Sequence, residues 1–303
     1  MPTYAEIRRQ ELKHIEQSLK DDRKMKRELA KIYNSSLEDI QRHIDADIQR
    51  FAHKEGVSMA EAKRIISKTD VEAFQSTAKR YVEDRDFSPT ANAELRKFNV
   101  TMRTSRLELL QSRINLDTIS LALEEERLTE TYIANSAMNE LKRQSGILSM
   151  SIPSQAELKR LAKSVVLSDV SGATFSDRIW ANQHELRNNI NQAIERALIQ
   201  GQHPRNAAAS IKRLVRDEYG MKKRAADRIL VTESARGQII AQRESYKDAG
   251  IDHYIYLAEN SACDICHELD DKVFKVKDMV IGVNAPFMHP WCKCSTSAYY
   301  DEE

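Results

Sequence analysis

The chain has 303 residues, 41% of them hydrophobic and 31% charged, with only eight glycines and six prolines, a composition that favours long solvated helices over a sheet-rich fold. Its formal net charge of +1 combines a mildly basic part before residue 251 with an acidic part after it, and the basic excess is too small to predict a nucleic-acid-binding surface. No apolar run approaches the roughly 18 residues that span a bilayer, and the charged start contains no apolar signal core, so we expect a soluble, non-membrane protein that folds in a cytoplasm.

Residues 1–148 predict an elongated helical N-terminal region. Five apolar residues recur at steps of three and four, which places them on one stripe of an amphipathic helix that ends at Gly56: Leu37, Ile40, Ile44, Ile48 and Phe51. Capping boxes at 58–61 and 69–72 predict two further helices. Residues 90–145 contain neither glycine nor proline, so we expect one very long helix or a helical hairpin there, used in a bundle or a rod.

Serine, glycine and proline gather in residues 149–174, which we interpret as a linker between domains. Residues 175–303 then predict an α+β domain. Its helices are expected at 175–201, from Pro204 onward, and at 221–249.

The apolar period changes after the last of these helices. Alternating residues at 253–257 and a short run at 273–276 predict a small antiparallel sheet. The expected fold class is therefore mainly α, with a long-helix N-terminal region followed by an α+β C-terminal domain that holds a small sheet and a Cys/His knot.

All four cysteines flank these predicted strands. Cys263 and Cys266 are separated by two residues, and the second group comprises His289, Cys292 and Cys294. Such spacing gathers soft ligands around one tetrahedral ion, so we predict a structural zinc site. The second group offers three ligands for two positions. An extended strand favours Cys292 with Cys294, because residues two apart share a face, whereas a turn at Pro290 favours His289 with one of them.

Other chemistry for these residues stays open. Disulfides or free thiols are the first alternative. A catalytic zinc is less favoured, because a closed site with four protein ligands leaves no position for water. A nucleophilic dyad of Cys266 or Cys292 with His267 or His289 lacks an evident third group that would orient the histidine.

Glu233 is the remaining candidate for chemistry, in the middle of a predicted helix. We interpret it as a buried carboxylate paired with Arg228 or Arg236, and an active-site glutamate is the alternative. The sequence contains no glycine-rich phosphate loop and no nucleotide-binding fingerprint. We therefore expect a protein that is not an enzyme.

Several features together resemble the phage Mu F-like minor head proteins, also called phage head morphogenesis proteins. The resemblance covers roughly residues 170–298. Its parts are the run Phe175–Trp180, the helix that carries Thr232-Glu233, the tyrosine-rich strand, the turn at 269–274, and the two groups Cys263-x-x-Cys266 and His289-Pro-x-Cys292-x-Cys294.

Three positions depart from the family pattern. Val231 stands where the family usually has arginine, Asp271 where it has glycine, and Lys293 where it has arginine between the last two cysteines. Lys293 keeps the positive charge but loses the bidentate guanidinium fork, so a role in pairing with a carboxylate becomes less secure.

The resemblance implies a virion protein inside the head, near the portal vertex of a tailed phage, that acts in head assembly and in some cases leaves with the DNA. It implies the portal protein as a partner, with scaffolding or major capsid protein and non-specific DNA as further partners. The rival interpretations are a zinc-stabilised DNA-binding protein and, less favoured, an enzyme that uses Glu233.

Overall fold

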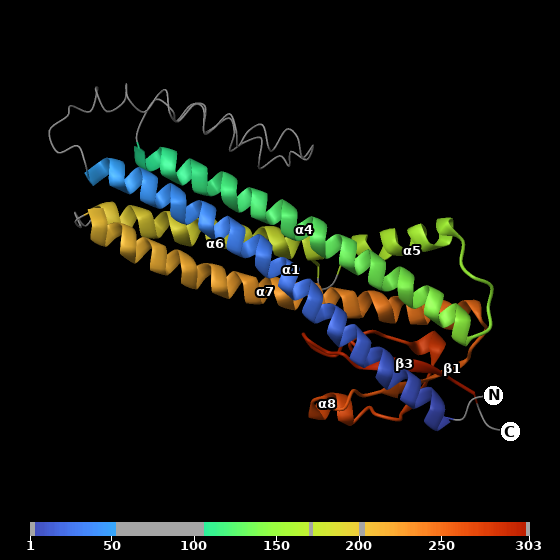
Figure 1. Cartoon of the computed structure of the whole chain (residues 1–303). Coiled ribbons are helices and arrows are strands. Elements are labelled where there is room, and N and C mark those ends of the chain that lie inside the picture. Colours follow the sequence, from blue (N-terminus) through green and yellow to red (C-terminus); the bar gives the residue numbers. More distant parts are fainter. Residues whose placement is uncertain (1–3, 53–105, 170–171, 200–203, 301–303) are drawn as a thin grey trace. The chain divides into compact units, whose positions relative to one another are not determined.

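The computed structural model describes residues 4–52, 106–169, 172–199 and 204–300 (Figure 1). The predicted helices that begin at the capping boxes 58–61 and 69–72 lie outside the described residues, and so does the beginning of the predicted helix 90–145.

The prediction of a mainly helical chain with a small C-terminal sheet is confirmed. In the described ranges the helices longer than ten residues are α1 (Tyr4–Ala52), α4 (Arg106–Ile147), α5 (Gln155–Leu167), α6 (Phe175–Ile199) and α7 (Pro204–Asp248). Ile40 and Ile44, from the apolar stripe predicted for the first helix, are completely buried.

Helix α7 differs from the prediction of two helices divided near residue 221. It continues unbroken through Gly220, where a Cβ would meet no atom within 4 Å. A glycine costs about 1 kcal/mol in a helix interior. Packing outweighs this cost, because Tyr219 and Lys222 on either side are both buried.

The predicted linker, residues 149–174, contains helix α5 and is therefore not a structureless connection. Ser154 and Glu157 form a capping box, in which each side chain accepts a hydrogen bond from the other residue's backbone amide. Leu158 and Val165 on this helix are buried.

The chain forms two compact units, and each is assembled from separate segments. Unit 1 consists of Met1–Glu28, Arg127–Arg178 and Ala226–Glu303, and unit 2 consists of Leu29–Glu126 and Ile179–Ala225. Helices α1, α4, α6 and α7 contribute to both units. This division does not follow the predicted one into residues 1–148 and 175–303, whose separate functional roles stay a prediction.

Unit 2 is built from portions of α1, α4, α6 and α7 that buried polar contacts join to one another (Figure 1). Tyr33 donates a hydrogen bond of 2.8 Å to Glu125, and Gln183 donates one of 2.7 Å to the same carboxylate. The hydroxyls of Ser36 and Tyr219 lie 2.8 Å apart. These contacts connect all four helices.

Unit 1 contains the sheet, with strands β1 (His253–Leu257), β2 (Val273–Lys275) and β3 (Ser295–Tyr299) in the antiparallel order β2-β1-β3. The short helix α8 (Asp264–His267) lies between β1 and β2, and the 3₁₀ helix η1 (Val276–Asp278) follows β2 directly.

One cluster of buried side chains packs α7 against this sheet. Ile239 and Tyr246 of α7 contact Tyr254 of β1 and Ala298 of β3. The Tyr246 hydroxyl also lies 3.1 Å from the Thr296 hydroxyl. Helix and sheet therefore form one core, which positions the loops that carry the cysteines.

Candidate metal centre

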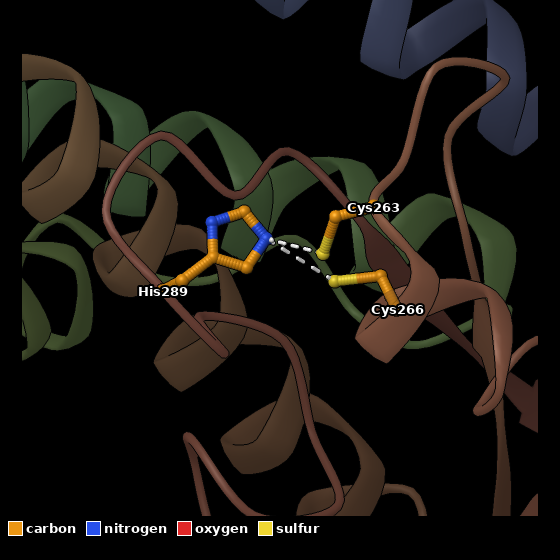
Figure 2. Close-up of side chains that lie close together, drawn as sticks. All are labelled: Cys263, Cys266 and His289. Carbon is orange, nitrogen blue, oxygen red and sulfur yellow. Dashed lines mark hydrogen bonds between the residues drawn. The ribbon is translucent and has the colours of Figure 1, made fainter.

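The predicted metal ligands lie on two loops beside the sheet (Figure 2). Cys263 directly precedes α8 and Cys266 lies within it. His289, Cys292 and Cys294 lie on the loop that leads into β3. The two groups are distant in the sequence, and the antiparallel pairing of β1 with β2 and β3 brings them together.

The first loop is a single helical turn. The amide of His267 donates a hydrogen bond of 2.9 Å to the carbonyl of Cys263. Residues three apart in a helix lie on one side, so Cys263 and Cys266 face the same way. Cys263 is exposed to solvent whereas Cys266 is completely buried.

The second loop contains a tight turn at Pro290. The amide of Cys292 donates to the carbonyl of His289 over 3.1 Å, and Trp291 adopts the left-handed conformation with φ of 71°. Cys292 and Cys294 both precede the first residue of β3. The turn favours the arrangement in which His289 and one cysteine complete the site.

Three of the separations between ligand atoms are close to those around a tetrahedral ion. His289 Nε2 lies 3.1 Å from Cys263 Sγ and 3.5 Å from Cys266 Sγ (Figure 2). Cys266 Sγ lies 3.9 Å from Cys292 Sγ. Metal–sulfur bonds near 2.3 Å and metal–nitrogen bonds near 2.0 Å imply ligand separations of about 3.5 to 3.8 Å at a tetrahedral zinc ion.

The candidate ligands form two sets of three, and both sets contain Cys266. The atoms of Cys263, Cys266 and His289 lie within 4.8 Å of one another, and so do those of Cys266, Cys292 and Cys294. All four cysteines are free thiols, and the 3.9 Å between Cys266 Sγ and Cys292 Sγ is far beyond the roughly 2.05 Å of a disulfide. This Cys/His cluster could hold a metal ion.

The environment distinguishes Cys292 from Cys294. A hydrogen bond from the Cys294 thiol, aided by backbone amides, lowers the pKa of Cys292 to about 4. The same hydrogen bond, together with burial, raises the pKa of Cys294 well above its usual range. Burial likewise raises the pKa of Cys266 to about 12. The loop therefore favours a thiolate at Cys292, the form that binds metals.

His289 is oriented by the turn on which it lies. Its Nδ1 lies 2.8 Å from the carbonyl of Pro290, and this hydrogen bond raises the pKa of His289. A proton held on Nδ1 leaves Nε2 as the free nitrogen, and Nε2 is the atom that faces the thiols. Metal-bound histidines are oriented in the same way by a partner of the other ring nitrogen.

Helix α7 supports the second loop through the residues just before Glu233. The amide of Trp291 donates to the hydroxyl of Thr232 over 3.4 Å, and the Lys293 ammonium donates to the carbonyl of Val231 over 3.4 Å. The segment 231–232 therefore contacts the loop directly.

Glu233 itself lies in a buried ion-pair cluster. It accepts hydrogen bonds of 2.7 Å from both Arg178 and Arg236, and it is 1% exposed. The predicted pairing with Arg236 is confirmed, whereas Arg228 is exposed. Arg178 lies on α6, and no pattern in the sequence indicated it. Arg236 also donates to the Ser168 hydroxyl over 2.6 Å, which holds the end of α5. This geometry is that of a structural carboxylate.

Sequence reasoning missed Tyr256 as a part of the site. Its side chain is completely buried and packs against Cys266, Cys292 and Cys294. Burial together with the neighbouring thiol of Cys266 raises the pKa of Tyr256. The hydroxyl therefore keeps its proton and can donate a hydrogen bond to a thiolate. The signal available in the sequence was its position in the strand that leads into Cys263.

Asp271 occupies a position where the resemblance expects glycine, and its backbone shows why. Its φ is 61°, in the left-handed region that glycine enters freely and aspartate tolerates better than most residues. Its amide donates to the carbonyl of Tyr256 over 2.9 Å. The substitution therefore keeps the turn that follows the first cysteine pair.

Residues 188–297 match the model of the family described as Phage Mu protein F like protein, which agrees with the resemblance found for the C-terminal part of the chain. No curated protein and no solved structure gave a significant match. None of the helices in the described part of the chain is both long and apolar enough to span a membrane.

Proposed function

We propose that this protein is a minor head protein of a tailed phage, which acts in head assembly at the portal vertex and lies inside the virion. The match of residues 188–297 to the Phage Mu protein F like family carries this proposal. The matched residues include both cysteine loops and Glu233, so the family region and the candidate metal centre are the same part of the chain.

The helices supply the surfaces for assembly. Long amphipathic helices bind partners by laying an exposed or displaced face into a groove. The portal protein is the proposed main partner, with scaffolding or major capsid protein as a second one. Packaged DNA would be contacted without sequence preference, since the basic excess before residue 251 is small.

The same proposal includes a structural zinc ion held by Cys263, Cys266, His289 and Cys292. This choice rests on three short separations, which link Cys263 to His289, His289 to Cys266, and Cys266 to Cys292. Cys294 would then donate a hydrogen bond to the Cys292 thiolate instead of binding the ion. Four protein ligands close the coordination sphere, which suits a structural role.

Zinc analysis of two matched variants tests the ligand set. Protein purified under reducing conditions without a metal-binding tag should contain about one zinc per chain. Cys294→Ser should keep the zinc and Cys292→Ser should lose it, as measured by plasma mass spectrometry on folded protein. The opposite result would assign Cys294 as the fourth ligand. Wild-type protein without metal, and with a mass two hydrogens lower per cysteine pair, would indicate disulfides.

Quantitative mass spectrometry of purified virions tests the assembly role. We expect a few copies per particle, and particles made without the protein should be defective in head assembly. Hundreds of copies per particle, or none, would contradict a minor head protein.

A further inference from the structure

The first part of helix α1 contacts the same two loops that carry the metal ligands. We call residues 4–28 the N-terminal segment and residues 263–294 the knuckle. Both belong to unit 1. The contacts of the segment with the knuckle and with the first residue of β3 are ion pairs, hydrogen bonds and one cation–π contact. They are made by Tyr4, Arg8, Glu11, Asp22 and Lys26.

The first of these contacts joins Lys293 to Asp22. The Lys293 Nζ lies 2.6 Å from Asp22 Oδ2, and the two side chains are 8% and 4% exposed. Asp22 also accepts a hydrogen bond of 2.8 Å from the Tyr132 hydroxyl. At position 293 this chain has lysine where the family usually has arginine, and the lysine still pairs with a carboxylate. Because Lys293 lies between Cys292 and Cys294, the ligand loop fixes its direction.

A second contact reaches the residues that follow α8. Arg8 donates to both carboxylate oxygens of Asp270, over 2.7 and 3.2 Å, and Tyr4 donates to Asp271. Asp270 also accepts a hydrogen bond of 2.7 Å from the amide of Ala258, at the end of β1. The turn after the first cysteine pair therefore holds the beginning of α1.

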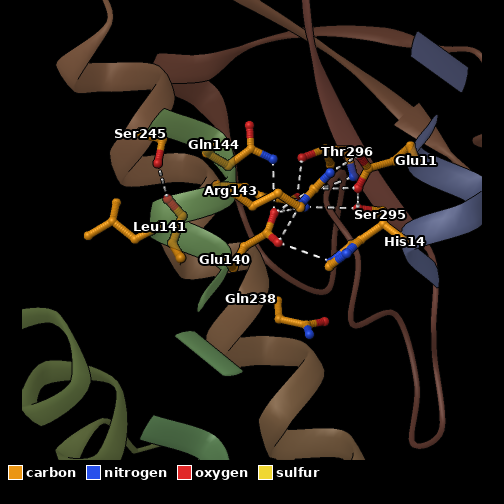
Figure 3. Close-up of polar contacts among 12 residues, drawn as sticks. Glu11, His14, Glu140, Leu141, Arg143, Gln144, Gln238, Ser245, Ser295 and Thr296 are labelled. Carbon is orange, nitrogen blue, oxygen red and sulfur yellow. Dashed lines mark hydrogen bonds and ion pairs between the residues drawn. The ribbon is translucent and has the colours of Figure 1, made fainter. Parts of the chain in front are cut away.

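Two more contacts complete the set. The Lys26 ammonium lies over the Trp291 ring, 5.2 Å from its centroid, and Trp291 is part of the turn between His289 and Cys292. Glu11 accepts a hydrogen bond of 2.6 Å from the hydroxyl of Ser295, the residue after Cys294 (Figure 3).

Apart from the contacts of the second loop with α7 and the packing of three cysteines against Tyr256, the knuckle has little structure of its own to fix these two loops. Helix α8 is one turn long, and most residues from 259 to 275 are exposed or only half-buried. Small segments with few buried apolar contacts depend on metal ligation for their structure. The ion would hold the Asp270 turn through Cys263 and Cys266, and the Lys293 turn through His289 and Cys292.

We infer that metal occupancy of the knuckle controls how firmly the N-terminal segment docks on the rest of unit 1. This inference rests on the metal assignment made above and goes beyond the assembly role. Docking and metal binding are then coupled, and such coupling is reciprocal: docking raises metal affinity by the same factor by which bound metal favours docking, so a chain whose segment is undocked loses up to that factor in metal affinity.

Hydrogen exchange of the full chain, read by mass spectrometry, tests the first direction. Removal of zinc by a chelator should speed exchange in residues 4–26 at least fivefold, while α6 residues 179–194 keep their protection. If zinc is bound and its removal leaves residues 4–26 unchanged, the inference is overturned and the metal assignment stands. If the protein binds no metal, both fail.

Metal affinity of two lysine variants tests the reverse direction. Lys293→Met should still bind one zinc, should exchange faster in residues 4–26, and should release zinc to a competing chelator more readily. Lys277→Met is the matched control, since Lys277 lies exposed on η1. Asp22→Asn alters the same pair from α1 and should weaken zinc binding without touching a ligand. Unchanged affinity in both Asp22→Asn and Lys293→Met would overturn the inference.

Discussion

Arg143 on α4 donates two hydrogen bonds, each of 2.8 Å, to the two carboxylate oxygens of Glu11 on α1 (Figure 3). The same guanidinium donates to Glu140 over 2.7 and 2.8 Å, and Glu140 is almost completely buried. One guanidinium therefore neutralises two buried carboxylates, and the packing of α1 and α4, which carry these carboxylates, depends on it.

Arg143→Met should be strongly destabilising. Removal of one partner from a buried ion pair typically costs about 3 to 5 kcal/mol, because the remaining charge stays buried without a counter-ion. Urea unfolding followed by circular dichroism measures the change. Arg127→Met on the exposed face of α4 is the matched control and should change stability by less than about 0.5 kcal/mol. Similar values for the two variants would contradict the assigned role of the cluster.

The stabilising effect of Arg143 should depend on pH. Burial alone would raise the pKa of Glu140, but the Arg143 guanidinium and His14 outweigh it and hold that pKa well below its usual range. A carboxyl with a lowered pKa in the folded state contributes its stability above the unfolded pKa, about 4.3, and loses it as the pH falls further. The difference in unfolding free energy between wild type and Arg143→Met should therefore be constant from pH 7 to 5 and shrink near pH 3.5. A difference that stays constant down to pH 3.5 would show that Glu140 is not involved.

Two glycines of α7 should respond in opposite ways to alanine. A Cβ at Gly237 would lie 3.0 Å from Cγ1 of Val165, a β-branched side chain that cannot easily turn away. Overpacking costs about 1 to 3 kcal/mol, more than the roughly 1 kcal/mol that alanine gains in helix propensity. Gly237→Ala should thus lower stability, whereas Gly220→Ala, which has open space, should raise it by about 0.5 to 1 kcal/mol. Thermal unfolding distinguishes the two, and an equal effect of both would contradict the close packing at Gly237.

Alkylation of the metal-free, reduced protein should follow the order set by exposure and pKa. Cys263 is exposed, and a hydrogen bond from the Cys266 amide lowers its pKa, so it should react first with iodoacetamide at pH 7. Cys266 is buried and its pKa is raised to about 12, so it should react much more slowly than Cys263. Peptide mass spectrometry gives the order, and added zinc should protect Cys263. Equal rates for Cys263 and Cys266 would be inconsistent with this geometry.

Local sequence patterns predicted the elements of this fold better than its assembly. The apolar period around Ile40 and Ile44 predicted a buried helical stripe, and the change of period at 253–257 predicted β1. Two helices were predicted where α7 runs unbroken through Gly220, because the local pattern does not contain the burial of Tyr219 beside it. The spacing of the cysteines predicted a metal site, and the choice among His289, Cys292 and Cys294 as its remaining ligands stays a prediction.

The partners of the site could not be predicted in the same way. Asp22 and Lys293 lie near opposite ends of the chain, and neither residue carries a local signal for the other. Arg178 and Tyr256 were missed for the same reason, since each acts through a contact that only the tertiary fold creates. Pairing of distant charged residues needs the three-dimensional arrangement, which a single sequence does not contain.

The assembly of unit 1 from the first, middle and last segments has a consequence for synthesis. Glu11 leaves the ribosome long before its partners Arg143 and Ser295, so the environment of α1 stays incomplete until both have been made. Strand β3 is the last of the described elements of this unit to be made. A nascent chain that stops before Ser295 would leave α1 without one of its partners, so unit 1 cannot complete its folding before that point.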